Sequence, residues 1–209
     1  MTTPVVPPPA LSPELAALLP AALHAHCETC AVPKGMRLFG LGQRPRAMHF
    51  VERGEVVLER PGAQGELVVL QRTRHGFVGE ASLQSARYHC DARAVSASVV
   101  TRIPVRDIRA ALEQDPAFAM RWVGMLNREV RRLRMQCERL SLHRVQDRLL
   151  HLIETEGRDG CYPLGAGLKS LAGELGVTHE ALYRCVAALE QRGVLGRDEA
   201  GLRLAPPRG

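Results

Sequence analysis

Two stretches of helical periodicity lie close together toward the C-terminal end of the chain. Apolar residues recur there at three- and four-residue spacing, which predicts two helices that each bury one face. The first set is Leu168, Leu171, Ala172 and Leu175, and the second is Leu182, Cys185, Val186 and Leu189. Between the two sets, Gly176 suits a tight turn and Thr178 suits the cap of the second helix. The pattern predicts a helix, a turn and a second helix.

The opposite face of the second helix is polar and suits the major groove of DNA. Arginine can donate two hydrogen bonds to guanine and glutamate can accept one from cytosine N4, so Glu180 and Arg184 are candidates to contact base edges. The full candidate DNA interface is Lys169, Ser170, Thr178, His179, Glu180, Tyr183 and Arg184. The alternative is an ordinary helical hairpin with a solvated polar face, because such patterns recur by accident.

Between about residues 32 and 105 the periodicity changes from helix to strand. Short runs rich in Val, Leu and Phe alternate with glycines, and PGAQG at 61–65 predicts a hairpin loop. Many short strands joined by turns predict a small antiparallel barrel or sandwich. A short helix is predicted before them, over residues 13–26.

A long helix is predicted from about 116 to 139. One side carries an apolar stripe at near-heptad spacing, which is typical of a coiled-coil dimer interface. The stripe is Phe118, Trp122, Met125, Leu126, Leu133, Cys137 and Leu140. The alternative is a core helix packed within its own domain. A further helix over about 142–155 leads to the helix-turn-helix, and GVLGRDEAGLRLAP after it predicts two short strands around a turn, a wing.

The charge balance is compatible with a nucleic-acid partner. The 209 residues include 28 Lys+Arg and 22 Asp+Glu, a net charge of +6. A moderate basic excess suits DNA without establishing it. No run of 18 apolar residues is present, so no membrane span is expected. The Pro-rich segment 1–12 lacks Lys and Arg and predicts a flexible arm rather than a signal or transit peptide, which favours a cytoplasmic protein.

A cluster of cysteines and histidines, His24, His26, Cys27 and Cys30, is a second candidate site. Two imidazoles and a Cys-x-x-Cys in seven residues suit a tetrahedral metal ion, and the same cysteines suit a reversible disulfide. His24 and Cys27 also lie at helical spacing. The alternative is therefore a pair of half-buried helix residues with no chemical role.

The order of strands, long helix and winged helix-turn-helix resembles the Crp/Fnr superfamily of bacterial transcription regulators over about residues 13–205. KGMRLFGLGQRPRAMHFVERGEVVL is similar to that family's opening strands, FVGEASL to its phosphate cassette, and THEALYR to the start of its recognition helix. The resemblance implies an α+β chain with four parts. These are a flexible arm at 1–12, an antiparallel β-barrel sensor domain of the cyclic-nucleotide-binding jelly-roll type at 13–115, a dimerisation helix at 116–140, and a winged helix-turn-helix domain at 141–209.

The candidate effector pocket departs from the cyclic-AMP-binding members of that family. Gly79 and Glu80 match their cassette, but Cys90 and Asp91 stand where those members have an Arg-Ser pair that binds the cyclic phosphate. A thiol beside a carboxylate does not offset the desolvation of a phosphate.

Two further sets of residues affect whether this pocket could bind cyclic AMP. They are the positions that would contact adenine and the nearest alternative cations. The family's adenine-contacting Thr-Ser pair falls on Leu133 and Arg134. Arg87 or Arg93 could still supply a cation to a phosphate. We nevertheless expect a signal other than cyclic AMP.

An iron–sulfur cluster is the family's other relevant cofactor. Its oxygen-sensing members use an N-terminal group of cysteines and one more in the barrel. This chain has only two cysteines near its start, and Thr101 stands where the barrel cysteine is expected. A metal ion and a cluster both stay open as cofactors.

These patterns predict a homodimeric, sequence-specific DNA-binding transcription regulator on a palindromic operator, with a metal or thiol redox state as the candidate signal. The expected partners are double-stranded DNA and a second copy of the chain, and the resemblance implies RNA polymerase for an activator. The alternative is a thiol- or metal-binding protein, or a redox enzyme, whose helix-turn-helix is not used on DNA. No nucleotide loop, Gly-x-Ser-x-Gly elbow or metalloprotease helix is present, which argues against an enzyme.

Overall fold

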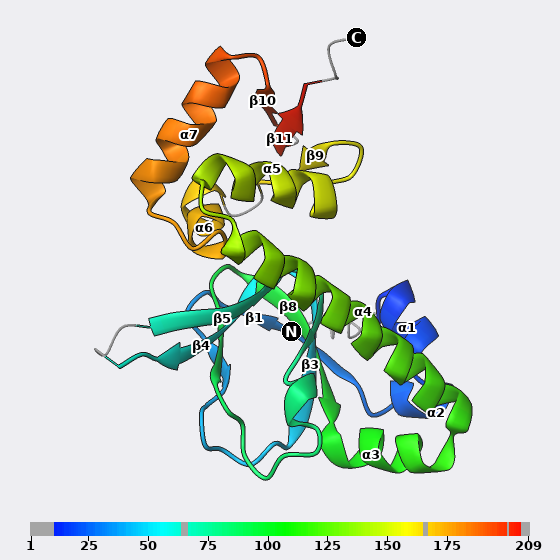
Figure 1. Cartoon of the computed structure of the whole chain (residues 1–209). Helices are drawn as coiled ribbons and strands as arrows, with labels where there is room; N and C mark the ends of the chain where they lie inside the picture. The colour runs from blue at the N-terminus through cyan, green and yellow to red at the C-terminus, as the bar shows by residue number, and fades with distance from the viewer. Residues whose placement is uncertain (1–10, 64–66, 165–166, 200, 206–209) are drawn as a thin grey trace, which may run out of the picture. The chain divides into compact units, whose positions relative to one another are not determined.

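The computed structural model describes residues 11–63, 67–164, 167–199 and 201–205. Most of the predicted arm and part of the predicted loop at 61–65 lie outside these described residues. The chain divides into two compact units, 1–125 and 126–209, and helix α4, Pro116–Ser141, contributes to both (Figure 1). Among the described residues, no helix combines the length and apolar character that a membrane span requires.

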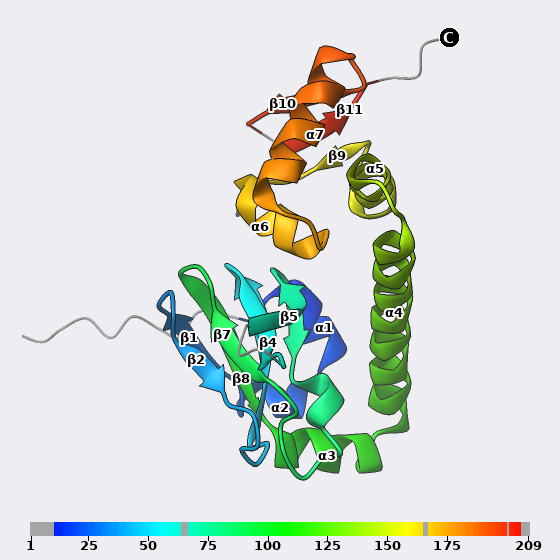
Figure 2. The same cartoon turned by 60° about the vertical axis from the view of Figure 1, so that its left-hand side comes forward.

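The first unit is built on two four-stranded antiparallel sheets (Figure 2). The first sheet, in the order β1-β8-β3-β6, consists of β1 Glu28–Val32, β8 Ser98–Pro104, β3 Ala47–Arg53 and β6 Gly76–Val78. The second sheet, in the order β2-β7-β4-β5, consists of β2 Arg37–Phe39, β7 Asp91–Ala94, β4 Val56–Pro61 and β5 Leu67–Thr73. Buried side chains from both sheets form one core, among them Val51, Val56, Ala92 and Val100. The fold is a jelly-roll sandwich.

The two sheets are not closed into the β-barrel predicted from the sequence. No pairing between the described strands joins one sheet to the other. Strand β5 ends the second sheet, and β1 and β6 end the first. Glycine turns and short apolar runs predict antiparallel neighbours, but they do not determine whether the outer strands meet. The sandwich alternative is the correct one.

Helices flank the first sheet, and the start of α4 is buried in this unit. The predicted helix at 13–26 is two helices, α1 Pro13–Leu18 and α2 Ala21–His24, because Pro20 has an extended conformation (ψ 143°). Helix α3, Val105–Gln114, follows β8 directly. Trp122 of α4 is only 4% exposed, and its ring centroid lies 5.2 Å from that of Phe77 on β6.

The second unit packs three further helices on the end of α4 and adds a small sheet. Its elements are α5 Val145–Glu156, β9 Cys161–Tyr162, α6 Gly167–Glu174, α7 His179–Gln191, β10 Leu195–Asp198 and β11 Gly201–Leu204. The strands pair in the order β10-β11-β9. One core includes Leu149 of α5, Leu171 of α6, Leu182 of α7 and Leu202 of β11.

A buried arginine fastens α4 to α5 within this unit. Arg139 is 1% exposed, and its guanidinium donates hydrogen bonds to the Glu156 carboxylate and to the Thr155 hydroxyl (3.5 Å). A buried cation needs such partners, since its desolvation is otherwise uncompensated. The last turns of α4 are thus held to the body of the second unit.

Candidate functional site

The turn between α6 and α7 has the geometry predicted for Gly176. This residue has φ +64°, in the left-handed region that favours glycine. Its N–H donates to the Gly173 carbonyl (3.4 Å), and the N–H of Val177 donates to the Ala172 carbonyl (3.0 Å). The two bonds form a Schellman motif, which ends α6. Leu140 lies against the turn, since a Cβ added at Gly176 would be 3.2 Å from its Cδ2 atom.

Helix α7 begins with the predicted threonine cap. The Thr178 hydroxyl oxygen accepts a hydrogen bond from the N–H of Ala181 (3.2 Å). The pKa of Glu180 is lowered, first by a hydrogen bond from its own backbone N–H and next by the Thr178 hydroxyl. Glu180 is therefore an ionised, exposed acceptor at the start of the helix.

The two faces of α7 differ as the sequence predicts. The buried side chains are Leu182, Val186 and Leu189, and Cys185, predicted on the same face, is half-buried. On the other face, the rings of His179 and Tyr183 meet edge-on with centroids 4.4 Å apart. Arg184 is exposed beside them. The remaining predicted contacts lie on α6, where Lys169 is exposed and Ser170 is half-buried.

The hairpin after α7 adds cations that the sequence analysis missed. Strands β10 and β11 turn at Asp198, whose carboxylate accepts the N–H of Gly201 (3.0 Å). Arg197 lies 3.5 Å from Glu190, and Arg203 lies 3.7 Å from Asp198. Such exposed ion pairs are weak, so both guanidinium groups are available to a phosphate. The alternation in GRDEAGLRL is the signal that would have identified them.

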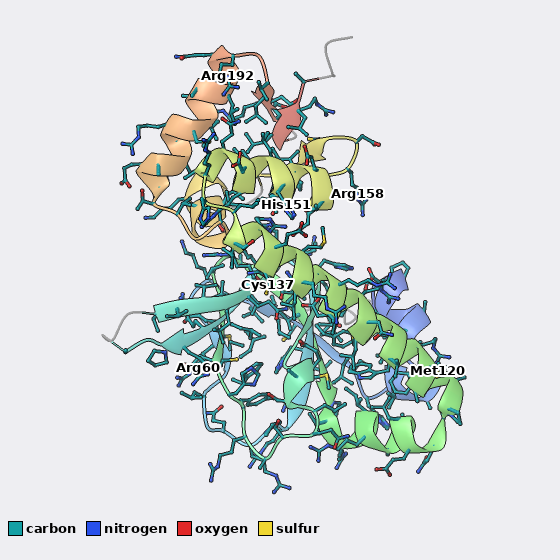
Figure 3. The ribbon with its side chains drawn as sticks, in the orientation of Figure 1. Arg60, Met120, Cys137, His151, Arg158 and Arg192 are labelled. Atoms are coloured by element: carbon teal, nitrogen blue, oxygen red, sulfur yellow. The ribbon has the colours of Figure 1, made fainter. Side chains whose placement is uncertain are left out.

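From Val123 onward, α4 carries a largely exposed apolar stripe, and Figure 3 labels one of its members, Cys137. The α4 stripe consists of Val123, Leu126, Val130, Leu133, Cys137 and Leu140. The spacing alternates between three and four, which is a heptad pattern. Met125, half-buried, is next to it. Phe118 and Trp122 were predicted in the dimer interface, but this is wrong because both are buried inside the first unit. Val123 and Val130 were missed.

Two aromatic rings occupy the space beside Gly79, the first of the predicted effector residues. Gly79 has φ +93°, and a Cβ there would be 3.3 Å from the Phe39 ring and 3.5 Å from the Tyr88 ring. These two rings stack with centroids 3.8 Å apart. Glu80 begins the short helix η1, Glu80–Ser82. Cys90 is buried, and burial raises the pKa of its thiol. An uncharged thiol is only a weak donor and supplies no positive charge to a phosphate.

The charged groups near this place have hydrogen-bond partners within the protein. The Asp91 carboxylate accepts the N–H of Leu41 (3.0 Å). Arg93 donates to both oxygens of Glu59 (2.7 and 2.8 Å), and Arg87 donates to a backbone carbonyl (2.8 Å). Arg93 is therefore not a free phosphate ligand, which supports the expectation that cyclic AMP is not the signal, whereas the exposed Arg87 keeps unused donors.

The two positions expected opposite adenine lack the chemistry for that contact. Leu133 and Arg134 are both exposed and belong to the second unit. Neither carries the hydroxyl that the Thr-Ser pair provides in the cyclic-AMP-binding members. Leu133 lies instead on the α4 stripe.

The histidines and cysteines of the 24–30 segment do not form a common site. The Cys27 and Cys30 thiols donate to separate backbone carbonyls (3.3 and 3.7 Å). His26 Nδ1 lies 3.1 Å from Asp107, and His24 Nε2 lies 3.4 Å from a backbone carbonyl. In the part of the chain that the structure describes, no group of three or more His, Cys, Asp and Glu residues could hold a metal ion. The metal site predicted from these four residues is not present there.

The Cys27 thiol is also unsuited to thiolate chemistry. Burial, and then the charge of Glu52, raises its pKa to about 11. Reactive cysteines have lowered pKa values because the thiolate is the nucleophile. A redox role for Cys27 and Cys30 stays a prediction that this environment disfavours.

Comparison with known proteins finds a family model that matches the sandwich and solved structures that are similar over most of the chain. Residues 29–115 match the cyclic nucleotide-binding domain family. No curated protein sequence matches the chain. FixK2 from Bradyrhizobium japonicum has a similar structure, with a TM-score of 0.70 and 18% identity over 86% of this chain and 93% of that one. A putative cAMP-binding regulatory protein from Silicibacter pomeroyi has a TM-score of 0.61 and 24% identity over 92% and 90%. A transcriptional regulator of the CRP family from Thermus thermophilus has a TM-score of 0.62 and 18% identity, over 84% of this chain and 91% of that one.

Proposed function

We propose that this chain, which has the fold of the Crp/Fnr superfamily of transcription regulators, is a homodimeric regulator that binds a palindromic DNA operator. One observation carries the proposal. The N-terminal half of α7 presents Glu180 and Arg184 to solvent on a helix whose start is fixed by the Thr178 cap and the Gly176 turn. A short, rigid helix with base-complementary side chains at its exposed start is what a major groove admits.

The exposed side chains divide into base-reading and phosphate-binding groups. Arg184 can donate two hydrogen bonds to guanine, and Glu180 can accept one from the cytosine paired with it. Arg197 and Arg203 on the β10–β11 hairpin suit phosphates, which position a protein without reading sequence. Together these elements constitute a winged helix-turn-helix.

The α4 stripe supports the dimer. A heptad stripe of exposed apolar residues is unfavourable in water and is covered when two such helices form a coiled coil. A two-fold axis along α4 would place two α7 helices in successive major grooves, about one helical turn apart. Contact with RNA polymerase would follow if the protein is an activator.

The proposed regulator does not respond to cyclic AMP. Stacked Phe39 and Tyr88 rings adjoin Gly79, and Arg93 is engaged by Glu59 in two hydrogen bonds. A cyclic phosphate would therefore lack a cation to offset its desolvation. We expect no binding of cyclic AMP at micromolar concentrations in isothermal titration calorimetry, and measurable binding there would contradict this part of the proposal.

Enrichment of DNA from a random pool tests the function directly. The full-length protein should retain one palindromic motif, and each retained duplex should carry two chains. A Glu180→Ala/Arg184→Ala variant should lose the enrichment. Arg60→Ala serves as the control, since it removes an exposed arginine of β4 in the other unit (Figure 3). Absence of any enriched motif, or the same motif from the double variant, would refute the assignment.

A further inference from the structure

A cavity of about 560 Å³ lies between the two sheets of the first unit. Residues of β1, β2, β3 and β8 line it, together with the loop that joins β2 to β3. Its wall includes the apolar side chains of Val32, Phe39, Ala47 and Val100. A volume of this size accepts a small organic molecule. None of the predicted effector residues, Gly79, Glu80, Cys90 and Asp91, lines it.

The charged side chains around this cavity all have one sign. Arg37, Arg44, Arg46 and Arg102 line it, and no aspartate or glutamate does. Two of the four have an acidic neighbour outside the lining: Arg102 at 3.7 Å and Arg37 at 3.6 Å, both through exposed guanidinium groups. Among the described residues Arg44 and Arg46 form no salt bridge. A lining with four guanidinium groups and no carboxylate favours an anion, because each guanidinium can bind its oxygens with two hydrogen bonds.

A buried polar group also faces this cavity without a partner. His49 of β3 is 8% exposed, and its Nδ1 atom has no hydrogen-bond partner among the described residues. Burial, and then the charge of Arg102, lowers the pKa of its imidazole to about 4. The ring is therefore neutral near pH 7 and can donate or accept a hydrogen bond. A buried polar atom without a partner is uncommon in folded proteins, and a ligand atom would satisfy it.

We propose that this cavity binds a small amphipathic organic anion. The apolar body of the ligand lies against Phe39 and Val100, and its carboxylate or phosphate is held by Arg46 and Arg102, within reach of His49. Stacking of Phe39 on Tyr88 closes the interior toward Gly79, so this site is separate from the place of a cyclic phosphate. The site belongs wholly to the first unit and does not depend on DNA binding.

Fluorescence of anilinonaphthalene sulfonate, an aromatic anion, tests the site in the full-length protein. Saturable binding to the wild type is expected, with displacement by octanoate or by phenyl phosphate; the more effective of the two identifies the preferred head group. The Arg46→Gln/Arg102→Gln variant should bind the probe at least about tenfold more weakly, because each charge-assisted hydrogen bond contributes about that factor. Arg53→Gln is the control, an exposed arginine of β3 outside the lining, and should bind as the wild type does.

Equal affinity in the wild type and the double variant would overturn the proposal, and so would an equal loss in Arg53→Gln. Displacement by inorganic phosphate as effective as that by the organic anions would overturn the role of the apolar wall. If circular dichroism shows the double variant unfolded, the exposed Arg44→Gln replaces it. That variant should weaken binding at least about threefold, and unchanged binding would count against the site.

Discussion

Arg184 is the side chain whose replacement best separates base reading from general attraction to DNA. Its loss in Arg184→Ala should weaken binding to the enriched motif by about 1–3 kcal/mol and relax the preference at one base pair. Arg184→Lys keeps the charge but not the paired donors, so it should lose the same preference while retaining more affinity for random DNA. Quantitative competition with single-base variants of the motif measures both effects. Equal losses on specific and random DNA would contradict a base-reading role.

His49 should make the stability of the first unit depend on acid pH. Its pKa is about 4 in the folded chain against an ordinary value of 6.5. Above pH 6.5 the imidazole is therefore neutral in both the folded and the unfolded state, and its burial does not reduce the free energy of unfolding through protonation. As the pH falls from 6.5 toward 4, the unfolded chain binds the proton first and the folded state loses stability. The loss by pH 4.5 should be about 2–3 kcal/mol. Urea unfolding of the wild type and His49→Leu at pH 7.5 and 4.5 checks this, since the variant should lack that part of the decline.

Single residues were predictable from the sequence where their role depends on near neighbours. The Thr178 cap and the Gly176 turn are determined within a few positions, and both were predicted correctly. His49 and the arginines around it come from distant segments, and nothing local marks them. The 24–30 segment shows the converse, because a metal-like spacing did not place its side chains around one point.

At the scale of elements, the α4 stripe should determine the oligomeric state. Leu133→Glu places a carboxylate on the stripe in both copies, which should weaken the dimer by at least roughly 3 kcal/mol, or about 100-fold. Sedimentation velocity over a concentration series measures the shift to monomer. Met120→Glu is the matched control, because Met120 is a highly exposed residue of α4 outside the heptad spacing (Figure 3). Retention of the dimer by Leu133→Glu would exclude the stripe as the interface.

The elements themselves were largely predictable, but their partners were not. Apolar periodicity gave the long helix, yet it could not separate the face that Phe118 and Trp122 bury from the α4 stripe. Two apolar faces of one helix with similar residue spacing cannot be told apart from the sequence alone, so they are predicted as a single stripe. The sandwich was harder for the same reason, since closure depends on pairings between strands far apart along the chain.

At the scale of the whole molecule, the two cores should unfold in separate transitions. Trp122 is the only tryptophan and lies in the first unit, so its fluorescence follows that unit, whereas circular dichroism follows both. Leu171→Ala, in the second core, should lower the free energy of unfolding of the second unit by about 2–4 kcal/mol. The midpoint followed by Trp122 fluorescence should stay unchanged. Val51→Ala, in the first core, should do the reverse. One shared midpoint displaced equally by both variants would show a single cooperative molecule.

The contact of Leu140 with the Gly176 turn has a mechanical consequence. Leu140 ends the α4 stripe, and the turn it touches immediately precedes α7. Arg148 of α5 holds the same turn, because its guanidinium donates to the Leu175 carbonyl (2.9 Å). Arg139 in turn fixes α4 to α5. A small rotation of the last turns of α4 should therefore be transmitted through these contacts to the turn before α7, so that the start of α7 changes its orientation with them.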